Sequence, residues 1–294
     1  MEIANPIYDV VFKYLMNDNE VAKLIISTII EEEILELKFL PQEGTLDLQQ
    51  RSLTVYILDF SAKIKIAEDE YKNVLIEIQK AKFATDIMRF RRYLGSEYQK
   101  KENTYSVEIN GEEVKKAMPI LSIYFLGYKL DNTTAPIIKV ARHYYDLTTG
   151  KEINIKEEFI ESLTHDSLII QIPYLAHESK TEIEQMLSIF DQSKKTGNSH
   201  ILNIKEDDYP EKYREVIRRL QRAIAEPEVR KTMDIEDEIL EELQNMEREI
   251  EIKDKALEAK DKALESKDKA LEAKDKALEA KDKIIEELRK KLSS

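Results

Sequence analysis

Residues 75–80, with the sequence Leu-Ile-Glu-Ile-Gln-Lys, decide the fold because they set two polar side chains inside an aliphatic run. The β-branched and aromatic composition of residues 54–66 predicts a second strand just before them, interrupted by Asp59. Between the two lies the polar segment Glu68 to Glu70, which is typical of a turn. The sequence therefore predicts a β-hairpin centred near residue 68.

In a hairpin with that centre, Asp59 pairs with Glu77, and opposed residues on antiparallel strands project from the same face. Gln79 lies two residues further along the strand and shares that face. Two adjacent carboxylates repel each other unless a cation lies between them. Paired carboxylates on apolar strands suit a hard divalent cation, which can activate a water for attack on a phosphate. The alternative is that Asp59 and Glu77 face solvent on a one-sided sheet.

The segment that follows these strands is basic, since residues 80–101 contain seven Lys or Arg and two acidic residues. Its apolar spacing predicts a helix over residues 84–99, with Arg89 and Arg92 on the polar side. The expected core-facing stripe consists of Ile87, Phe90, Leu94 and Tyr98. A basic helix beside a pair of acids suits DNA, because cations bind its backbone phosphates. An ordinary solvated helix face is the alternative explanation.

These residues resemble the Rpn-like group of the PD-(D/E)XK nuclease superfamily, the PD-(D/E)XK nuclease family transposases. The resemblance covers residues 5–130. It rests on the Asp-Val-Val-Phe-Lys stretch at 9–13, Asp59, the Glu-Ile-Gln stretch at 77–79, Arg89 and Tyr93. It implies an α/β fold with a restriction-endonuclease-like mixed sheet flanked by helices. The activity it implies is Mg²⁺-dependent DNA endonuclease cleavage associated with recombination or transposition, with Asp59 and Glu77 as metal ligands.

The resemblance also implies a role for Gln79, which stands where the wider superfamily has a lysine. Glutamine can orient a group by hydrogen bonding, but it supplies no positive charge. Lys80 should point to the opposite face from Gln79, so Lys82 is the better candidate to supply that charge. The predicted site therefore comprises Asp59, Glu77, Gln79 and Lys82, with Lys80, Arg89 and Arg92 as DNA contacts.

The missing lysine also motivates a second hypothesis from a different class. In it the chain is a catalytically inactive nuclease-like interaction protein, and its C-terminal helix assembles or spaces partners. The overall charge agrees with this alternative, because 59 acidic residues against 46 basic ones argue against indiscriminate binding to nucleic acid or anionic membranes. The absence of cysteine from the 294 residues excludes disulfides, thiol catalysis and cysteine-ligated metals.

The expected location is the cytoplasm, with no membrane partner. The first residues carry no basic, apolar leader, and the apolar runs are too short to span a bilayer. The six glycines are too scattered to form a G-x-G-x-x-G or P-loop motif, which removes the common nucleotide-binding signatures.

Beyond Pro227 the sequence contains neither proline nor glycine, and from Lys253 the heptad Lys-Asp-Lys-Ala-Leu-Glu-Ala repeats to residue 280, with Ser266 replacing one alanine. This pattern predicts a long helix. Leu or Ile recurs every seventh residue from Leu243 to Leu292, at heptad position a, whereas position d is lysine through the middle.

Lysine at d makes a poor coiled coil, so both a solvated spacer helix and a weak homo-oligomeric coiled coil remain open. The predicted organisation is a nuclease-like domain over residues 1–225, an acidic helical linker over 226–252 and a heptad helix over 253–294.

Overall fold

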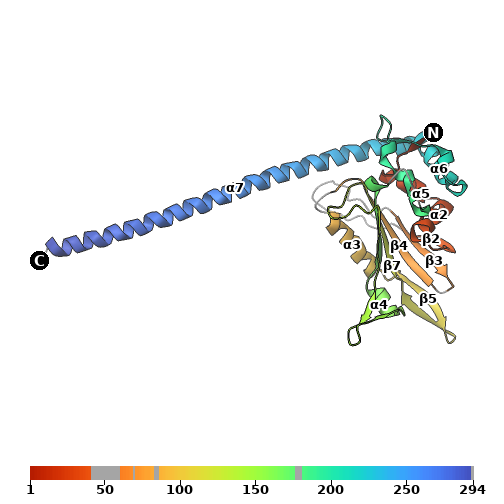
Figure 1. The fold of residues 1–294 in the computed structure, drawn as a ribbon, viewed down its shortest axis with the longest axis horizontal. Helices are drawn as coiled ribbons and strands as arrows, with labels where there is room; N and C mark the ends of the chain where they lie inside the picture. Colours follow the sequence, from red (N-terminus) through yellow and green to blue (C-terminus); the bar gives the residue numbers. More distant parts are fainter. Residues whose placement is uncertain (41–59, 69, 83–85, 176–180, 293–294) are drawn as a thin grey trace. The chain divides into compact units, whose positions relative to one another are not determined.

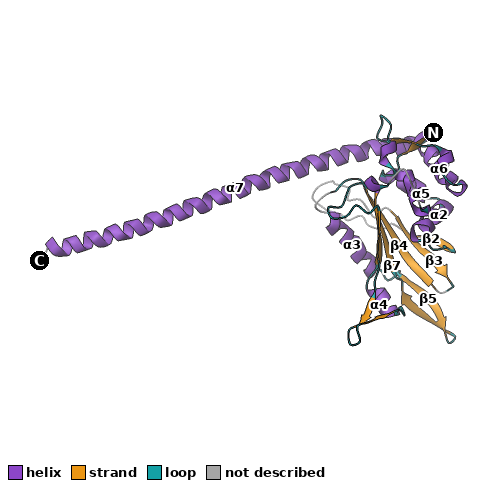
Figure 2. Cartoon of the chain, in the orientation of Figure 1, coloured by secondary structure: helices purple, strands orange, loops and turns teal. Residues whose placement is uncertain are grey.

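The computed structural model describes residues 1–40, 60–68, 70–82, 86–175 and 181–292. The chain divides into two compact units, Met1–Asp237 and Glu238–Ser294. The first unit is an α/β structure, and the second consists of the greater part of one long helix (Figures 1 and 2). The first unit includes the beginning of the segment predicted as a linker, because Val229 and Met233 are buried in its core.

A mixed six-stranded sheet forms the centre of the first unit, in the order β2-β3-β4-β7-β11-β8. The central strands β4, β7 and β11 are parallel to one another, while β2, β3 and β8 pair antiparallel with their neighbours. These strands are β2 (Glu36–Phe39), β3 (Phe60–Ala67), β4 (Glu70–Gln79), β7 (Ile120–Leu126), β8 (Ile137–Val140) and β11 (Asp166–Gln171).

Among the described residues, three short antiparallel pairs lie outside this sheet: β1 with β12, β5 with β6, and β9 with β10. Their bounds are β1 (Glu2–Ala4), β5 (Thr104–Ile109), β6 (Glu112–Ala117), β9 (Tyr144–Asp146), β10 (Lys151–Ile153) and β12 (Ile201–Asn203). The α-helices are α1 (Asp9–Met16), α2 (Asn19–Ile30), α3 (Asp86–Gln99), α4 (Glu158–Leu163), α5 (Glu182–Leu187), α6 (Arg214–Ala225) and α7 (Pro227–Leu292). Short 3₁₀ turns span Ile172–Tyr174, Ser188–Phe190, Gln192–Lys194, Glu206–Asp208 and Glu211–Tyr213.

The two faces of the central strands differ in chemistry because side chains alternate along each strand. One face is mainly apolar and packs against α1, α2, α5 and α6, forming the main core. From β4 and β7 it carries Val74, Ile76, Ile78, Leu121, Ile123 and Phe125. The other face carries Asn73, Glu77, Gln79, Ser122 and Tyr124, and α3 covers it (Figure 1). The polar face is therefore where chemistry can occur.

Helix α3 reaches this face because β4 and β7 are parallel. Parallel neighbours need a crossover connection, and here the connection consists of α3 followed by the β5–β6 hairpin. The buried residues of α3 include Phe90 and Glu97, whereas Ile87 is 61% exposed and Tyr98 is 39% exposed. The predicted stripe is thus wrong at its two ends. The buried side of the helix is rotated toward Glu97, because that carboxylate finds hydrogen-bond partners under the helix.

Residues 10–30 form two helices, because Asp18 caps a new start by accepting hydrogen bonds from the backbone N–H groups of Glu20 and Val21. Residues 137–145 are split between β8 and β9, which belong to different sheets. The sequence reasoning also missed β11, whose apolar run is only three residues long, Leu168 to Ile170.

No helix among the described residues is long and apolar enough to cross a membrane.

Gly127 allows the ends of β4 and β7 to approach closely. Its N–H donates to the carbonyl oxygen of Gln79 at 2.7 Å. A Cβ atom at this position would lie 2.5 Å from the carbonyl oxygen of Lys80 and 3.0 Å from that of Gln79. Only glycine therefore fits beside the polar end of β4.

We expect Gly127→Ala to destabilise the first unit by about 1–3 kcal/mol, the usual range for an overpacked site. Urea unfolding followed by circular dichroism measures the change. Gly197→Ala serves as the control, because a Cβ at Gly197 meets no atom within 4 Å. Equal stability of the two variants would show that the strand ends are free to separate.

The first turns of α7 belong to the first unit and cap α1. The Glu236 carboxylate accepts hydrogen bonds from the backbone N–H groups of Asp9 and Val10, at 3.0 and 2.9 Å. N–H groups at the start of a helix have no acceptor within the helix, and the N-cap residue of α1 makes no side-chain hydrogen bond to them. Burial raises the pKa of Glu236 to about 7, helped by the charge of Asp9 and opposed by the Val10 N–H.

The raised pKa of Glu236 determines in which direction the free energy of unfolding changes with pH. Glu236 holds its proton to higher pH in the folded chain than its ordinary value of 4.5. The folded state therefore binds more protons between about pH 4.5 and 7, so this residue lowers the free energy of unfolding as the pH rises through that window. In Glu236→Gln that contribution disappears. Stability curves against pH, with the exposed Glu238→Gln as control, should differ in slope there, and parallel curves would contradict the assignment.

Candidate functional site

The hairpin register predicted from the sequence is confirmed for the described residues. Phe60 pairs with Ile76, and Ser61 pairs with Leu75, which is the register expected from a turn near residue 68. Strand β3 ends at Ala67 and β4 begins at Glu70. Asp59, the predicted partner of Glu77, lies outside the described residues, so their pairing stays a prediction.

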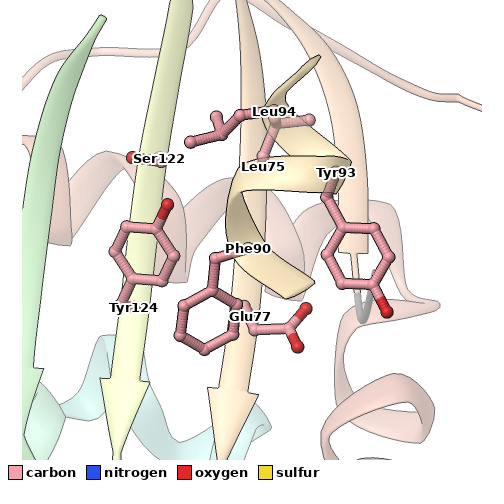
Figure 3. A pocket seen from close by; sticks show the side chains of 7 residues that line it. All are labelled: Leu75, Glu77, Phe90, Tyr93, Leu94, Ser122 and Tyr124. Carbon is pink, nitrogen blue, oxygen red and sulfur yellow. The ribbon is translucent and has the colours of Figure 1, made fainter. Parts of the chain in front are cut away.

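Glu77 lies on a central strand and is only 3% exposed. Its neighbours line a narrow pocket between α3 and strands β4 and β7: Leu75, Phe90, Tyr93, Leu94, Ser122 and Tyr124. Figure 3 shows the carboxylate between the rings of Phe90 and Tyr93. Burying a carboxylate in such surroundings costs free energy unless a polar group or a cation compensates its charge.

Tyr124 borders the same pocket from the adjacent strand, directly opposite Glu77 in the parallel ladder. Its ring packs on Phe90 with the ring centroids 5.2 Å apart. Burial raises the pKa of the Tyr124 phenol, and the charge of Glu77 adds to the rise against a hydrogen bond with Ser122. Tyr124 therefore remains a neutral phenol that can donate a hydrogen bond beside the carboxylate.

A buried polar network fixes α3 over the sheet. The side-chain amide of Asn73, which is fully buried, donates to the carboxylate of Glu97 and to Asn103, both at 3.2 Å. Lys100 completes the network with a 2.6 Å bond to Glu97. Because the partners come from β4, from α3 and from the loop that follows it, the network sets the position of the helix relative to Glu77.

Gln79 and the two lysines that follow it are placed on different sides. Gln79 is buried on the Glu77 face, and its amide nitrogen donates to the Ala81 carbonyl at 2.9 Å. Lys80 points to the other face, as expected, where it forms an ion pair with Asp237 and lies 3.6 Å from the Tyr8 ring centroid. Lys82 is exposed and pairs with Asp131 at 3.0 Å.

The acidic partner of Lys80 belongs to a cluster at the start of α7. Asp237 also accepts hydrogen bonds from the Tyr8 hydroxyl and lies 2.8 Å from His200 Nε2. These contacts, together with the Lys80 charge, lower the pKa of Asp237 against the effect of its burial. Lys80 is thus held in a structural network, which sequence reasoning had no means to find because Asp237 is 157 residues away.

Of the two DNA contacts predicted on α3, the structure describes the side chain of one, Arg92. Arg92 is exposed on the outer side of the helix, beside the exposed Arg91 and Met88. The side chain of Arg89 lies outside the described residues. The helix therefore offers a basic outer surface above the polar face of the sheet.

Sequence reasoning missed a second basic region, formed by strands β2 and β3 on the same face as Glu77. Lys38 and Lys63 are directly opposite each other in the ladder, an arrangement that like charges disfavour. Burial and the charge of Lys38 lower the pKa of Lys63, and Glu36 only partly offsets this. Lys63 also lies 4.3 Å from the Tyr71 ring centroid. The β-strand alternation around residues 60–66 was the available signal.

The described residues supply one of the two predicted ligands for a hard divalent cation. Glu77 supplies a buried carboxylate, the ligand that Mg²⁺ prefers. Within the described ranges, no three His, Asp or Glu side chains form a group that could hold a metal. The second predicted ligand, Asp59, is outside those ranges.

The chain matches no family model, no curated protein and no solved structure. Its function is therefore inferred from the residues of the site.

Proposed function

We propose that this chain is a Mg²⁺-dependent DNA endonuclease, a member of the Rpn-like PD-(D/E)XK group with a restriction-endonuclease-like core. The observation that carries the proposal is Glu77, a buried carboxylate on a central strand whose hairpin register agrees with the one predicted from the sequence. The same register, continued by one residue, is the one that a pairing of Asp59 with Glu77 requires.

In this proposal each residue of the polar face has a defined task. Glu77 and Asp59 hold the metal, which when bound supplies a polarised phosphate and an activated water. Gln79 orients groups through its amide, and Tyr124 supplies a neutral phenol next to Glu77. The outer side of α3, with Arg92, contacts the DNA backbone.

A second candidate function is supported by the lysines. Lys80 and Lys82 form ion pairs with Asp237 and Asp131. If no other cation replaces the lysine of the wider superfamily, the chain binds partners or DNA without cutting. A cleavage experiment separates the two functions.

We expect Glu77→Gln to abolish metal-dependent cleavage of plasmid DNA while the fold is kept. Removal of a direct metal ligand should cost at least as much as removal of an outer partner, roughly a hundredfold in rate. Nicking is measured by gel over a titration of Mg²⁺ and Mn²⁺. Asp59→Asn, tested in parallel, should have the same effect.

The control is Glu108→Gln, which removes an exposed glutamate from β5 and should leave the rate unchanged. If the wild-type chain neither binds a divalent metal in calorimetry nor nicks DNA, the nuclease proposal is wrong and the interaction protein is favoured.

Lys38 and Lys63, which lie opposite each other on β2 and β3, give a further prediction for DNA binding. Replacing Lys63 or Lys38 by glutamine should weaken binding to all sequences alike. It should also reduce the slope of log affinity against log salt by about one for each phosphate that the protein no longer neutralises. Fluorescence anisotropy in the Glu77→Gln background measures this without cleavage. Lys139→Gln, an exposed lysine on β8 at the other edge of the sheet, is the matched control and should leave the slope unchanged.

A further inference from the structure

The second unit exposes a regular row of leucines along α7. At heptad position a, Leu257, Leu264, Leu271 and Leu278 are each between 56% and 59% exposed, and Ile250 and Ile285 extend the row at either end. The helix is continuous through all of them. An apolar row kept in strict seven-residue register over this length is the arrangement that a left-handed supercoil of helices buries.

Opposite charges border the leucine row on its two sides. On a helix with 100° between residues, the aspartate of each heptad lies about 40° to one side of the leucine and the lysine at position d lies about 60° to the other. In the repeat these are Asp261, Asp268 and Asp275 on one border and Lys260, Lys267 and Lys274 on the other. The row is thus acidic along one edge and basic along the other.

Ion pairs within the helix leave these border charges available. The described pairs in and next to the repeat include Glu251 with Lys255 and Glu265 with Lys269, both at 2.6 Å. Those residues occupy heptad positions b and f, away from the leucine row. Lys253, the first lysine at position d, pairs with Glu249 at 3.5 Å, but over residues 254–285, within the described part of the chain, no ion pair uses an aspartate at position e or a lysine at position d.

We propose that the leucine row binds a second copy of this chain as a parallel, in-register pair. When two identical helices lie parallel about a twofold axis, the acidic border of one faces the basic border of the other. Asp261 and Lys260 follow Leu257 by four and three residues, so they are level to about 1.5 Å across the pair. An antiparallel pair would instead set aspartates against aspartates and lysines against lysines.

Two features select this pairing over the alternatives. A row one leucine wide leaves its border charges in water when two helices pair, whereas a third helix would bury them. The identical repeats tolerate slips of seven residues, but each slip leaves one leucine or isoleucine unpaired at each end of the row. The in-register pair therefore buries the most apolar surface.

The chain has no cysteine, which makes a single engineered cysteine an unambiguous probe. Ile250→Cys lies on the row near one end, so two copies meet there only in a parallel, in-register pair. Ile252→Cys is the matched control, because Ile252 is also exposed but lies on the opposite side of the helix. After mild oxidation of the full chain we expect a covalent dimer from Ile250→Cys and none from Ile252→Cys on a non-reducing gel.

Light scattering of the wild-type chain should give twice the monomer mass at micromolar concentrations. The triple variant Lys260→Glu, Lys267→Glu, Lys274→Glu should be monomeric, as should Asp261→Lys, Asp268→Lys, Asp275→Lys, and a mixture of the two should recover the dimer mass. Circular dichroism checks that both variants keep their helix content.

A monomeric wild type, a larger assembly, equal cross-linking at both cysteines, or a dimer without cross-linking at Ile250→Cys would each overturn the proposal. None of these outcomes depends on DNA cleavage, so the pairing and the nuclease proposal fail independently.

Discussion

The architecture of the first unit depends on the alternation of side chains along β4. This strand is hydrogen bonded on both sides, to β3 and β7, so every side chain must face one layer or the other. Ile76 and Ile78 enter the apolar core, which commits Glu77 and Gln79 to the opposite face. A slip of one residue would bury both polar groups in that core, and hydrophobic burial therefore fixes the position of the candidate site.

The same constraint explains why α3 covers the polar face. The crossover between parallel β4 and β7 carries the helix over the sheet, and the network of Asn73, Glu97 and Lys100 holds it there. Glu77 is consequently enclosed by Phe90, Tyr93 and Tyr124. Gly127 maintains the close approach of the two strand ends beside Gln79. The core, the crossover and the close approach together position the side chains of the site.

Much of this site followed from local pattern. The β3–β4 turn, the register of the hairpin and the shared face of Glu77 and Gln79 were all predictable, because strand alternation and turn position are set by neighbouring residues. The opposite direction of Lys80 was predictable for the same reason. The stripe on α3 was wrong at Ile87 and Tyr98, because a buried Glu97 is stable only through partners distant in sequence.

The sequence by itself determined the hairpin, the α/β character and the long heptad helix, since these arise from periodicities read over a few turns or strands. Only the tertiary structure decided which polar and charged side chains meet across the fold. Lys80 is bound by Asp237, α1 is capped by Glu236, and Lys38 meets Lys63 across two strands. Such contacts join residues far apart along the chain, and the free energy that selects them comes from burial and charge pairing in the assembled fold.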